Sequence, residues 1–198
     1  MPEPSEKYFA ALKRTQNHHA RQNKTFSGQF TWKQRKRIKP LIERFGCTSM
    51  LDYGSGKGKQ YDTAFNRDAD GKSLVEFFGI QPTLYDPGVP KYSAEPKGKF
   101  DLVICVQVLG SIPTVDLPWV IDRLYGFADK AVFVTERINA PNNKPIFDDM
   151  VDDMPRGMGI EDWMKLLRRP GSPIHLRAVF RSPETKWQIV EPEDQGPK

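Results

Sequence analysis

Ser49-Met50-Leu51-Asp52-Tyr53-Gly54-Ser55-Gly56-Lys57-Gly58-Lys59 is the stretch of this 198-residue chain that most clearly indicates its fold. A short apolar run ends in an acidic residue, three glycines follow at alternate positions, and the next segment can start a helix. Open α/β sheets bind nucleotide-like ligands at such turns, because glycine lets the backbone approach the ligand and a helix start has unpaired N–H groups. We therefore predict a ligand-binding turn between a strand and a helix.

On both sides of this turn, the chain alternates between apolar strands and amphipathic helices. The hydrophobic pattern predicts strands at 48–53, 82–85, 100–106 and 130–135, followed by a hairpin of 174–181 and 186–190. It predicts helices at 6–24, 31–45, 57–65, 73–78, 114–128 and 159–169, the second of them capped by Thr31. The run at 100–106 is apolar throughout, as a strand covered on both faces requires. This order predicts a three-layer α/β sheet, mostly parallel, with an antiparallel C-terminal hairpin.

Length and composition limit the class of protein. A chain of 198 residues fits one domain, and no apolar run reaches the ~20 residues of a membrane span or resembles a signal peptide. Cys47 and Cys105 lie in or beside apolar runs, which argues against a disulfide or a zinc site. On a helix, His18 and His19 would point about 100° apart, so we expect them on the surface and predict no metal site. A single cytoplasmic domain spanning 1–198 is expected.

The net charge of +5 comes from the N-terminal segment. Residues 1–45 hold eleven Lys or Arg and three Glu, a net charge of +8, whereas residues 46–198 carry a net charge of −3. A basic helical segment of this kind is either a solvated helix surface or an arm that meets a polyanion such as nucleic acid. The domain thus consists of a basic N-terminal segment, 1–45, and a sheet-forming region, 46–198.

Polar residues follow or end three of the predicted strands. Asp52 precedes the glycine turn, Asp86 follows the second strand, and Gln107 follows the third. Since ligands of open α/β sheets lie beyond the carboxyl ends of the strands, we expect these three side chains at one site. A carboxylate at Asp86 can accept hydrogen bonds from both hydroxyls of a ribose. Asp52 can accept N–H groups of the glycine turn or face a cationic ligand.

These motifs resemble class I S-adenosylmethionine-dependent methyltransferases over residues 48–136. Asp52-x-Gly54-x-Gly56-x-Gly58 is similar to their first motif, Asp86 matches their acidic ribose residue, and 100–109 matches the strand beneath the methionine part of the cofactor. S-adenosylmethionine has no phosphate, so it tolerates an acidic residue at the turn, whereas the phosphates of a dinucleotide would be repelled. The resemblance implies a Rossmann-like sheet, S-adenosylmethionine as cofactor, and a cofactor site made by Asp52, Tyr53, Gly54, Ser55, Gly56, Gly58, Asp86, Pro87, Val106 and Gln107.

The chain departs from the family pattern in two places. Only 14 residues separate Asp86 from Asp101, too few for a further helix and strand, so we expect the sheet edge that supplies adenine contacts to be trimmed. Gly110 and Ser111 stand where many small-molecule methyltransferases have Glu and His, so that histidine is missing as a proton acceptor. The Asn/Asp-Pro-Pro-Tyr signature of nucleobase amino methyltransferases is absent as well.

Methyl transfer depends mainly on alignment, since the sulfonium is already a good leaving group. If the acceptor must lose a proton, Glu136 is the first candidate base and His175 the second. We predict a methyltransferase for a small-molecule acceptor, held beneath the loop at 137–158 and the aromatic residues of 26–32. The alternatives are a non-catalytic protein that binds S-adenosylmethionine or a partner, and a nucleic-acid methyltransferase that uses 1–45. The sequence predicts no oligomeric state.

Overall fold

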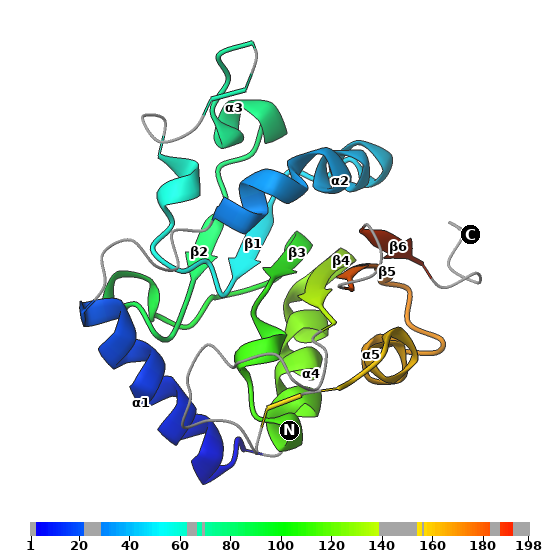
Figure 1. The fold of residues 1–198 in the computed structure, drawn as a ribbon. Coiled ribbons are helices and arrows are strands. Elements are labelled where there is room, and N and C mark those ends of the chain that lie inside the picture. Colours follow the sequence, from blue (N-terminus) through cyan, green and yellow to red (C-terminus); the bar gives the residue numbers. More distant parts are fainter. Residues whose placement is uncertain are drawn as a thin grey trace.

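The structure is a computed structural model that describes residues 3–21, 29–62, 67–68, 70–138, 154–155, 157–182 and 187–191. These residues form an α/β fold around a six-stranded sheet (Figure 1). Its strands are β1 (Met50–Tyr53), β2 (Thr83–Tyr85), β3 (Phe100–Val106), β4 (Ala128–Arg137), β5 (His175–Arg181) and β6 (Gln188–Val190). The first five strands are parallel, and β6 pairs antiparallel with β5. The predicted mostly parallel sheet with an antiparallel C-terminal hairpin is confirmed.

The glycine turn lies where the order in which the chain adds strands to the sheet reverses. The sheet runs β2-β1-β3-β4-β5-β6, so the chain moves outward from β1 to β2 and then returns past β1 to β3. Doubly wound sheets bind their ligands at the carboxyl ends of the two strands where the order changes. Asp52 of β1 lies beside Ile104 of β3, and Tyr53 lies beside Tyr85 of β2. The turn after β1 therefore lies at the position where such sheets bind ligands.

Apart from the helix expected at 57–65, the helices follow the predicted pattern with small shifts at their ends. They are α1 (Glu6–Arg21), α2 (Gln29–Phe45), α3 (Leu74–Phe78), α4 (Leu117–Phe127) and α5 (Ile160–Leu167), with 3₁₀ turns η1 (Lys59–Tyr61), η2 (Pro90–Tyr92), η3 (Leu109–Ser111) and η4 (Thr114–Asp116). In α3 local chemistry sets both ends, because Ser73 forms a capping box with Glu76 and Gly79 closes the helix in the left-handed conformation. The predicted cap of α2 is wrong: the helix begins at Gln29, and Thr31 is buried within it.

One predicted helix is wrong. Over its described part, the helix expected at 57–65 is only the 3₁₀ turn η1, and residues 63–66 lie outside the described chain. Gly58, before η1, has a left-handed backbone (φ 66°), and Asp62, after it, is extended (φ −72°, ψ 124°). Two side chains of η1 also turn inward and donate hydrogen bonds to Asp52, which holds the turn in this compact form.

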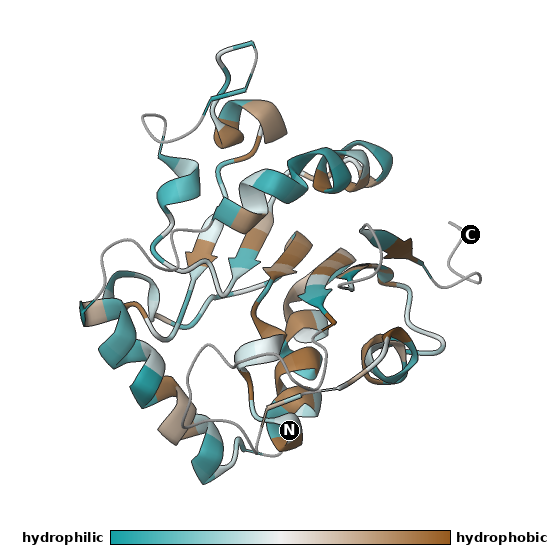
Figure 2. Cartoon of the chain, in the orientation of Figure 1, coloured by the Kyte–Doolittle hydropathy of each residue, from teal (hydrophilic) through white to brown (hydrophobic). Residues whose placement is uncertain are grey.

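Apolar residues cover both faces of the sheet. In β3, Val103 and Cys105 join one buried cluster, whereas Leu102 and Ile104 join another, as the period-two geometry of a strand requires. The first cluster includes residues of α4 and α5 together with Tyr8 of α1, and the second includes residues of α2 and α3. In Figure 2 the central strands are largely hydrophobic, whereas α1 and α2 are largely hydrophilic. The predicted burial of β3 on both faces is confirmed.

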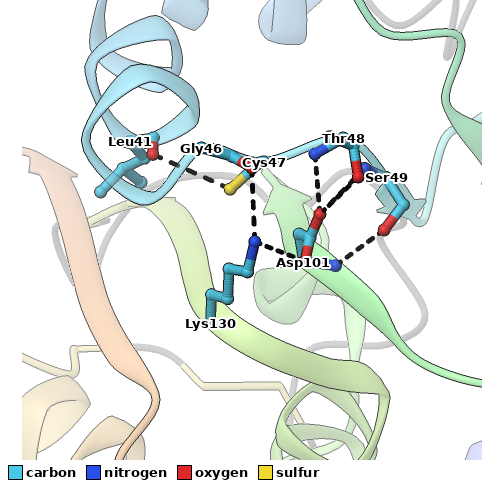
Figure 3. Close-up of polar contacts among 7 residues, drawn as sticks. All are labelled: Leu41, Gly46, Cys47, Thr48, Ser49, Asp101 and Lys130. Atoms are coloured by element: carbon cyan, nitrogen blue, oxygen red, sulfur yellow. Dashed lines mark hydrogen bonds and ion pairs between the residues drawn. The ribbon is translucent and has the colours of Figure 1, made fainter.

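Asp101, near the start of β3, lies at the amino edge of the sheet, opposite to the glycine turn. Figure 3 shows its contacts with Thr48, Ser49 and Lys130. Its Oδ2 accepts the N–H of Thr48 at 2.7 Å and that of Ser49 at 3.3 Å, and Lys130 Nζ lies 2.9 Å from Oδ1. Burial raises the pKa of Asp101, but the hydrogen bonds from Thr48 and Lys130 outweigh burial and lower the pKa to about 2. At this edge, therefore, the charge of a partly buried carboxylate is well compensated.

Candidate functional site

The glycine turn packs against the segment that follows β3. Gly54, Gly56 and Gly58 all have left-handed backbone, with φ of 81°, 59° and 66°. At Gly54 a Cβ would lie 2.3 Å from Cγ2 of Val108, so only glycine allows the two segments to approach this closely. This contact joins the ends of the two strands between which the sheet order reverses.

The N–H groups of the turn donate to the protein itself. Those of Gly54 and Ser55 donate to the carbonyl of Tyr85, at 2.7 and 3.1 Å. That of Gly56 donates to Oδ2 of Asp86, at 2.8 Å. Phosphate-binding loops instead direct several free N–H groups, often from a helix N-terminus, at the ligand. With its donors engaged and only the short η1 after it, this turn is a poor phosphate site.

Asp86 lies just beyond β2 and holds the turn in place while it keeps acceptor capacity for a ligand. It is 9% exposed, and besides Gly56 it accepts the N–H of Gly88 on Oδ1, at 2.8 Å. An ionised carboxylate can accept about four hydrogen bonds, so about two positions remain. Burial raises the pKa of Asp86, and the N–H groups of Gly88 and Gly56 and the nearby His19 oppose this effect.

Asp52 is a second buried carboxyl group, connected to the turn through η1. Its Oδ2 accepts the hydroxyl of Tyr61 at 2.8 Å and Nε2 of Gln60 at 3.1 Å. Gln60 Nε2 also lies 3.2 Å from the carbonyl of Ser55, which it donates to within the turn. Burial raises the pKa of Asp52 to about 7; the two side-chain hydrogen bonds oppose it, and the charge of Asp86 adds to it. Two buried carboxyl groups that repel each other favour a cationic ligand.

Gln107, directly after β3, combines backbone strain with an unpaired side chain. Its φ of 59° lies in the left-handed region, which is rare for residues with a side chain and is concentrated at functional sites. Its N–H donates to the carbonyl of Thr135 on β4, at 2.9 Å. Nε2 of Gln107 and Oγ1 of Thr135 are buried without a hydrogen-bond partner among the described residues. Because buried polar atoms are nearly always hydrogen-bonded, these two atoms can each bond a ligand or a water near the end of β3.

Glu136, the predicted candidate base, is buried near the end of β4. Its Oε1 accepts the N–H of Leu109, at the start of η3, at 2.7 Å. A Cβ on Gly110 would lie 3.0 Å from its Oε2, which gives a steric reason for glycine where the family pattern has glutamate. Burial raises the pKa of Glu136 to about 7, against the N–H groups of Gly110, Leu109 and Val108. Glu136 thus supports the segment after β3, and its use as a base stays a prediction.

His175 lies at the other edge of the sheet. It begins β5 beside Ala131, whereas the carboxyl edge is reached only at the far end of the same pairing, where Arg137 lies beside Arg181. Its imidazole packs on the ring of Phe45, with 5.1 Å between the centroids. The prediction that His175 lies near the strand ends of the site is therefore wrong, because β5 is parallel to β4 and starts at the amino edge.

Helix α1 lies across the carboxyl edge, an arrangement that the sequence did not predict (Figure 1). Nε2 of Gln16 donates to the carbonyl of Pro87, at 3.2 Å. A Cβ on Gly88 would lie 3.1 Å from Cγ2 of Thr15 and 3.4 Å from Cδ2 of His19. His19 is only 7% exposed, so the expectation of a surface histidine is wrong for this residue. The first helix therefore forms part of the candidate site.

The other end of α1 is anchored to the segment that leads into α4. Both the N–H and the hydroxyl of Ser5 donate to the carboxylate of Asp116, each at 2.7 Å. Tyr8 packs edge-on against Trp119, with ring centroids 5.1 Å apart. Tyr8 and His19 are eleven residues apart, or about three helical turns, so they lie on one face of α1. This spacing is the one signal in the sequence that links the burial of His19 to that of Tyr8, and it is weak.

The remaining residues of the predicted cofactor site are Tyr53, Ser55, Pro87 and Val106. Tyr53 and Val106 are buried at the ends of their strands, and the hydroxyl of Tyr53 accepts Nε of Arg123 at 3.2 Å. Ser55 is buried as well, and its carbonyl and that of Pro87 accept side-chain amides. The structure thus brings together the predicted residues after β1, β2 and β3, but leaves the side chains of Tyr53 and Val106 in the core.

Comparison with protein-family models, curated proteins and solved structures found no match for this chain. Among the described residues, no group of three or more His, Cys, Asp or Glu side chains is placed to hold a metal ion. None of the helices that the structure describes has both the length and the hydropathy that crossing a bilayer requires. Fold and site together define an α/β protein with a candidate ligand site at the carboxyl edge of its sheet.

Proposed function

We propose that this protein is an S-adenosylmethionine-dependent methyltransferase with a three-layer, Rossmann-like fold. The observation that carries the proposal is the glycine turn, whose N–H groups donate internally while two buried carboxyl groups, Asp52 and Asp86, are bonded to the turn or to η1. Such a turn has few donors for a phosphate and an excess of acceptors, which favours a cationic ligand that carries hydroxyl groups. S-adenosylmethionine has both a sulfonium and a ribose diol.

The residues present fit this cofactor in three respects. Asp86 has acceptor positions for the two ribose hydroxyls, and Nε2 of Gln107 is a donor in need of an acceptor. Helix α1, which is hydrogen-bonded to Pro87 and lies close to Gly88, covers one side of the site. When bound, the cofactor supplies a methyl group on a good leaving group, so the chain's task is to bind, orient and shield.

Proton transfer is a secondary requirement in this proposal. Glu136 already accepts the N–H of Leu109, so it orients the segment after β3 and is available as a base only through its remaining acceptor capacity. The predicted site for a small-molecule acceptor lies beneath the loop at 137–158 and the aromatic residues of 26–32. Residues 139–153 of that loop and Phe26 lie outside the described chain, so this prediction stays open. The non-catalytic alternative predicts no methyl transfer: a cofactor-binding protein would bind S-adenosylmethionine without transferring its methyl group, and a partner-binding protein would not bind it.

Incubation with methyl-tritiated S-adenosylmethionine and a panel of metabolites, single-stranded nucleic acids and duplexes tests the proposal. We expect label in at least one acceptor with the wild-type chain and strongly reduced label with Asp86→Ala. Cofactor binding without transfer to any acceptor would support the non-catalytic alternative instead. Lys57 and Lys59 place positive charge near the turn, so ATP and NADH should be tested as competitors of S-adenosylmethionine. If either nucleotide displaced S-adenosylmethionine, the assignment of the site to this cofactor would be contradicted.

A further inference from the structure

Helix α2 carries a basic surface that the proposed cofactor site does not use. We define the basic face of α2 as Lys33, Lys36 and Arg44, which are exposed on the outer side of the helix. Glu43 is the one acidic residue in α2, and it forms an ion pair with Lys39 at 3.8 Å. No ion pair within the part of the chain that the structure describes neutralises the three residues of the basic face. This surface therefore has a net positive charge available to an anionic partner.

Aromatic rings lie beside the basic face, and cationic groups are stacked on them. The ring of Phe30 has the guanidinium of Arg137 at 5.0 Å from its centroid. The ring of Trp187, next to the edge strand β6, has the guanidinium groups of Arg37 and Arg181 at 5.7 and 5.9 Å. Both rings are half-buried, so each retains accessible surface. Cationic side chains interleaved with accessible rings are typical of surfaces that bind single-stranded nucleic acid.

The basic face extends to the carboxyl edge of the sheet. Phe30 lies in the first turn of α2, and Arg137, with which it stacks, is the last residue of β4. The N-terminal end of α2 therefore lies at the same edge of the sheet as Glu136 and the glycine turn. Helix α2 also packs against η1, whose side chains contact Asp52. A chain bound along α2 would thus reach the candidate cofactor site.

We propose that the basic face of α2, together with Phe30 and Trp187, binds single-stranded nucleic acid and delivers a base to the carboxyl edge. The charges suit phosphates, and the accessible rings suit unstacked bases, which a duplex does not present. An anionic membrane surface fits less well, because the apolar face of α2 (Ile38, Leu41 and Ile42) is buried in the core and cannot insert into lipid. The role of the nucleic acid as methyl acceptor rests on the proposed function, whereas its binding does not.

Fluorescence anisotropy with a labelled single-stranded oligonucleotide at increasing salt tests the proposal. The variant K33Q/K36Q/R44Q removes three charges from the basic face of α2. The matched control, K7Q/K13Q/R21Q, removes three exposed charges from α1 and gives the same net charge. We expect the α2 variant to bind the oligonucleotide about ten-fold or more weakly than the wild type. The plot of log affinity against log salt should become less steep by about 2, because each of the three lost phosphate contacts contributes about 0.7 to its steepness. The α1 control should retain wild-type affinity.

Trp187→Ala tests stacking separately from charge. We expect it to weaken oligonucleotide binding about five-fold or more while leaving the salt slope unchanged. Equal losses in the two triple variants would overturn the proposal, and so would binding to vesicles of anionic lipid without binding to the oligonucleotide. Calorimetry with S-adenosylhomocysteine, the product of the cofactor, separates the nucleic-acid proposal from the proposed function. An α2 variant that binds S-adenosylhomocysteine but not the oligonucleotide would support nucleic-acid binding by the basic face of α2. A wild-type chain that binds the oligonucleotide but no cofactor would overturn the acceptor role and the proposed function together.

Discussion

Carboxyl groups at the two edges of the sheet differ in how deeply they are buried and how well their charge is compensated. At the amino edge, donors from the backbone and Lys130 lower the pKa of Asp101 to about 2. Near the carboxyl edge, burial outweighs the hydrogen bonds and raises the pKa of Asp52 and of Glu136 to about 7. Carboxyl groups with raised pKa that gather at one edge are typical of functional sites. This contrast follows from burial, because Asp101 is only partly buried whereas Asp52 and Glu136 are buried. It is consistent with a site at the carboxyl edge, where the glycine turn lies.

We predict that Asp52→Asn stabilises the protein at neutral and alkaline pH. Both donors to Asp52 contact Oδ2, so an amide oxygen can accept them while the charge is removed. The folded-state pKa of about 7 lies above the unfolded value of about 4, so the stability that this group contributes is present below pH 4 and lost as pH rises through 7. The gain in free energy of unfolding should be near zero at about pH 4 and on the order of 2–4 kcal/mol at about pH 8. Urea unfolding across this range measures it.

Glu136→Gln is the matched control for that prediction. It removes a carboxylate with a similarly raised pKa, but Glu136 faces backbone N–H groups of Leu109 and Gly110, and glutamine has a single acceptor oxygen. The loss of hydrogen bonds should offset the removal of charge, so its gain at alkaline pH should be clearly smaller than that of Asp52→Asn. Equal gains would contradict the roles assigned to the two groups.

Gly54→Ala tests the close approach between the ends of β1 and β3. Gly98 is the control, because its φ of 78° matches the 81° of Gly54 but a Cβ there would meet nothing within 4 Å. Gly98→Ala should therefore cost only the backbone term, about 1–2 kcal/mol of unfolding free energy. Gly54→Ala should cost about 1–3 kcal/mol more, because its Cβ would overlap Val108. Equal costs in chemical denaturation would show that this packing does not matter.

The strand-end residues of the site could be predicted from the sequence, whereas its cover could not. Asp52, Asp86 and Gln107 follow or end apolar runs, and local hydrophobicity sets where those runs end. The burial of His19 depends on the docking of α1, which long-range contacts such as the hydrogen bonds between Ser5 and Asp116 establish. Such contacts leave no local pattern beyond the weak helical spacing of α1.

At the scale of elements, we predict that Asp116→Ala loosens α1. Ser5 would lose both of its acceptors, and hydrogen bonds to a charged group contribute roughly 1.5–3 kcal/mol. Amide hydrogen exchange in α1 should therefore become about ten-fold faster or more, as mass spectrometry can measure. Asp122→Ala is the control, because Asp122 lies on α4 but pairs with Arg169 at 2.6 Å. Unchanged exchange in α1 would mean that other contacts hold this helix in place.

The elements that could be predicted are those whose ends are set by neighbouring residues. Helix α3 has its capping box and its closing glycine within six positions of sequence, from Ser73 to Gly79. The segment after the glycine turn is different: in its described part, 57–62, tertiary contacts hold a 3₁₀ turn in place of the expected helix. The hydroxyl of Tyr61 donates a hydrogen bond to Asp52, and Gly58, with its left-handed backbone, changes the direction of the chain. In short segments, such contacts outweigh helix propensity.

At the scale of the whole molecule, α1 lies where the described sheet ends. β2 is an edge strand with only three residues, and α1 contacts the residues that follow it. In the proposed function, α1 closes the side of the site that a further strand beyond β2, and the segment after it, would otherwise close. Under the two proposals, the basic N-terminal segment is divided between two tasks: α1 covers the proposed cofactor site, and α2 presents the surface proposed for nucleic acid.

Calorimetric titration with S-adenosylmethionine tests the central claim most directly. The wild-type chain should bind the cofactor, and Asp86→Ala should bind it about 10- to 150-fold more weakly, because lost hydrogen bonds to a carboxylate cost roughly 1.5–3 kcal/mol. Asp101→Ala should bind like the wild type, because its carboxylate also accepts backbone N–H groups but at the opposite edge of the sheet. No binding by the wild-type chain, or equal affinity in the Asp86 variant, would contradict the account.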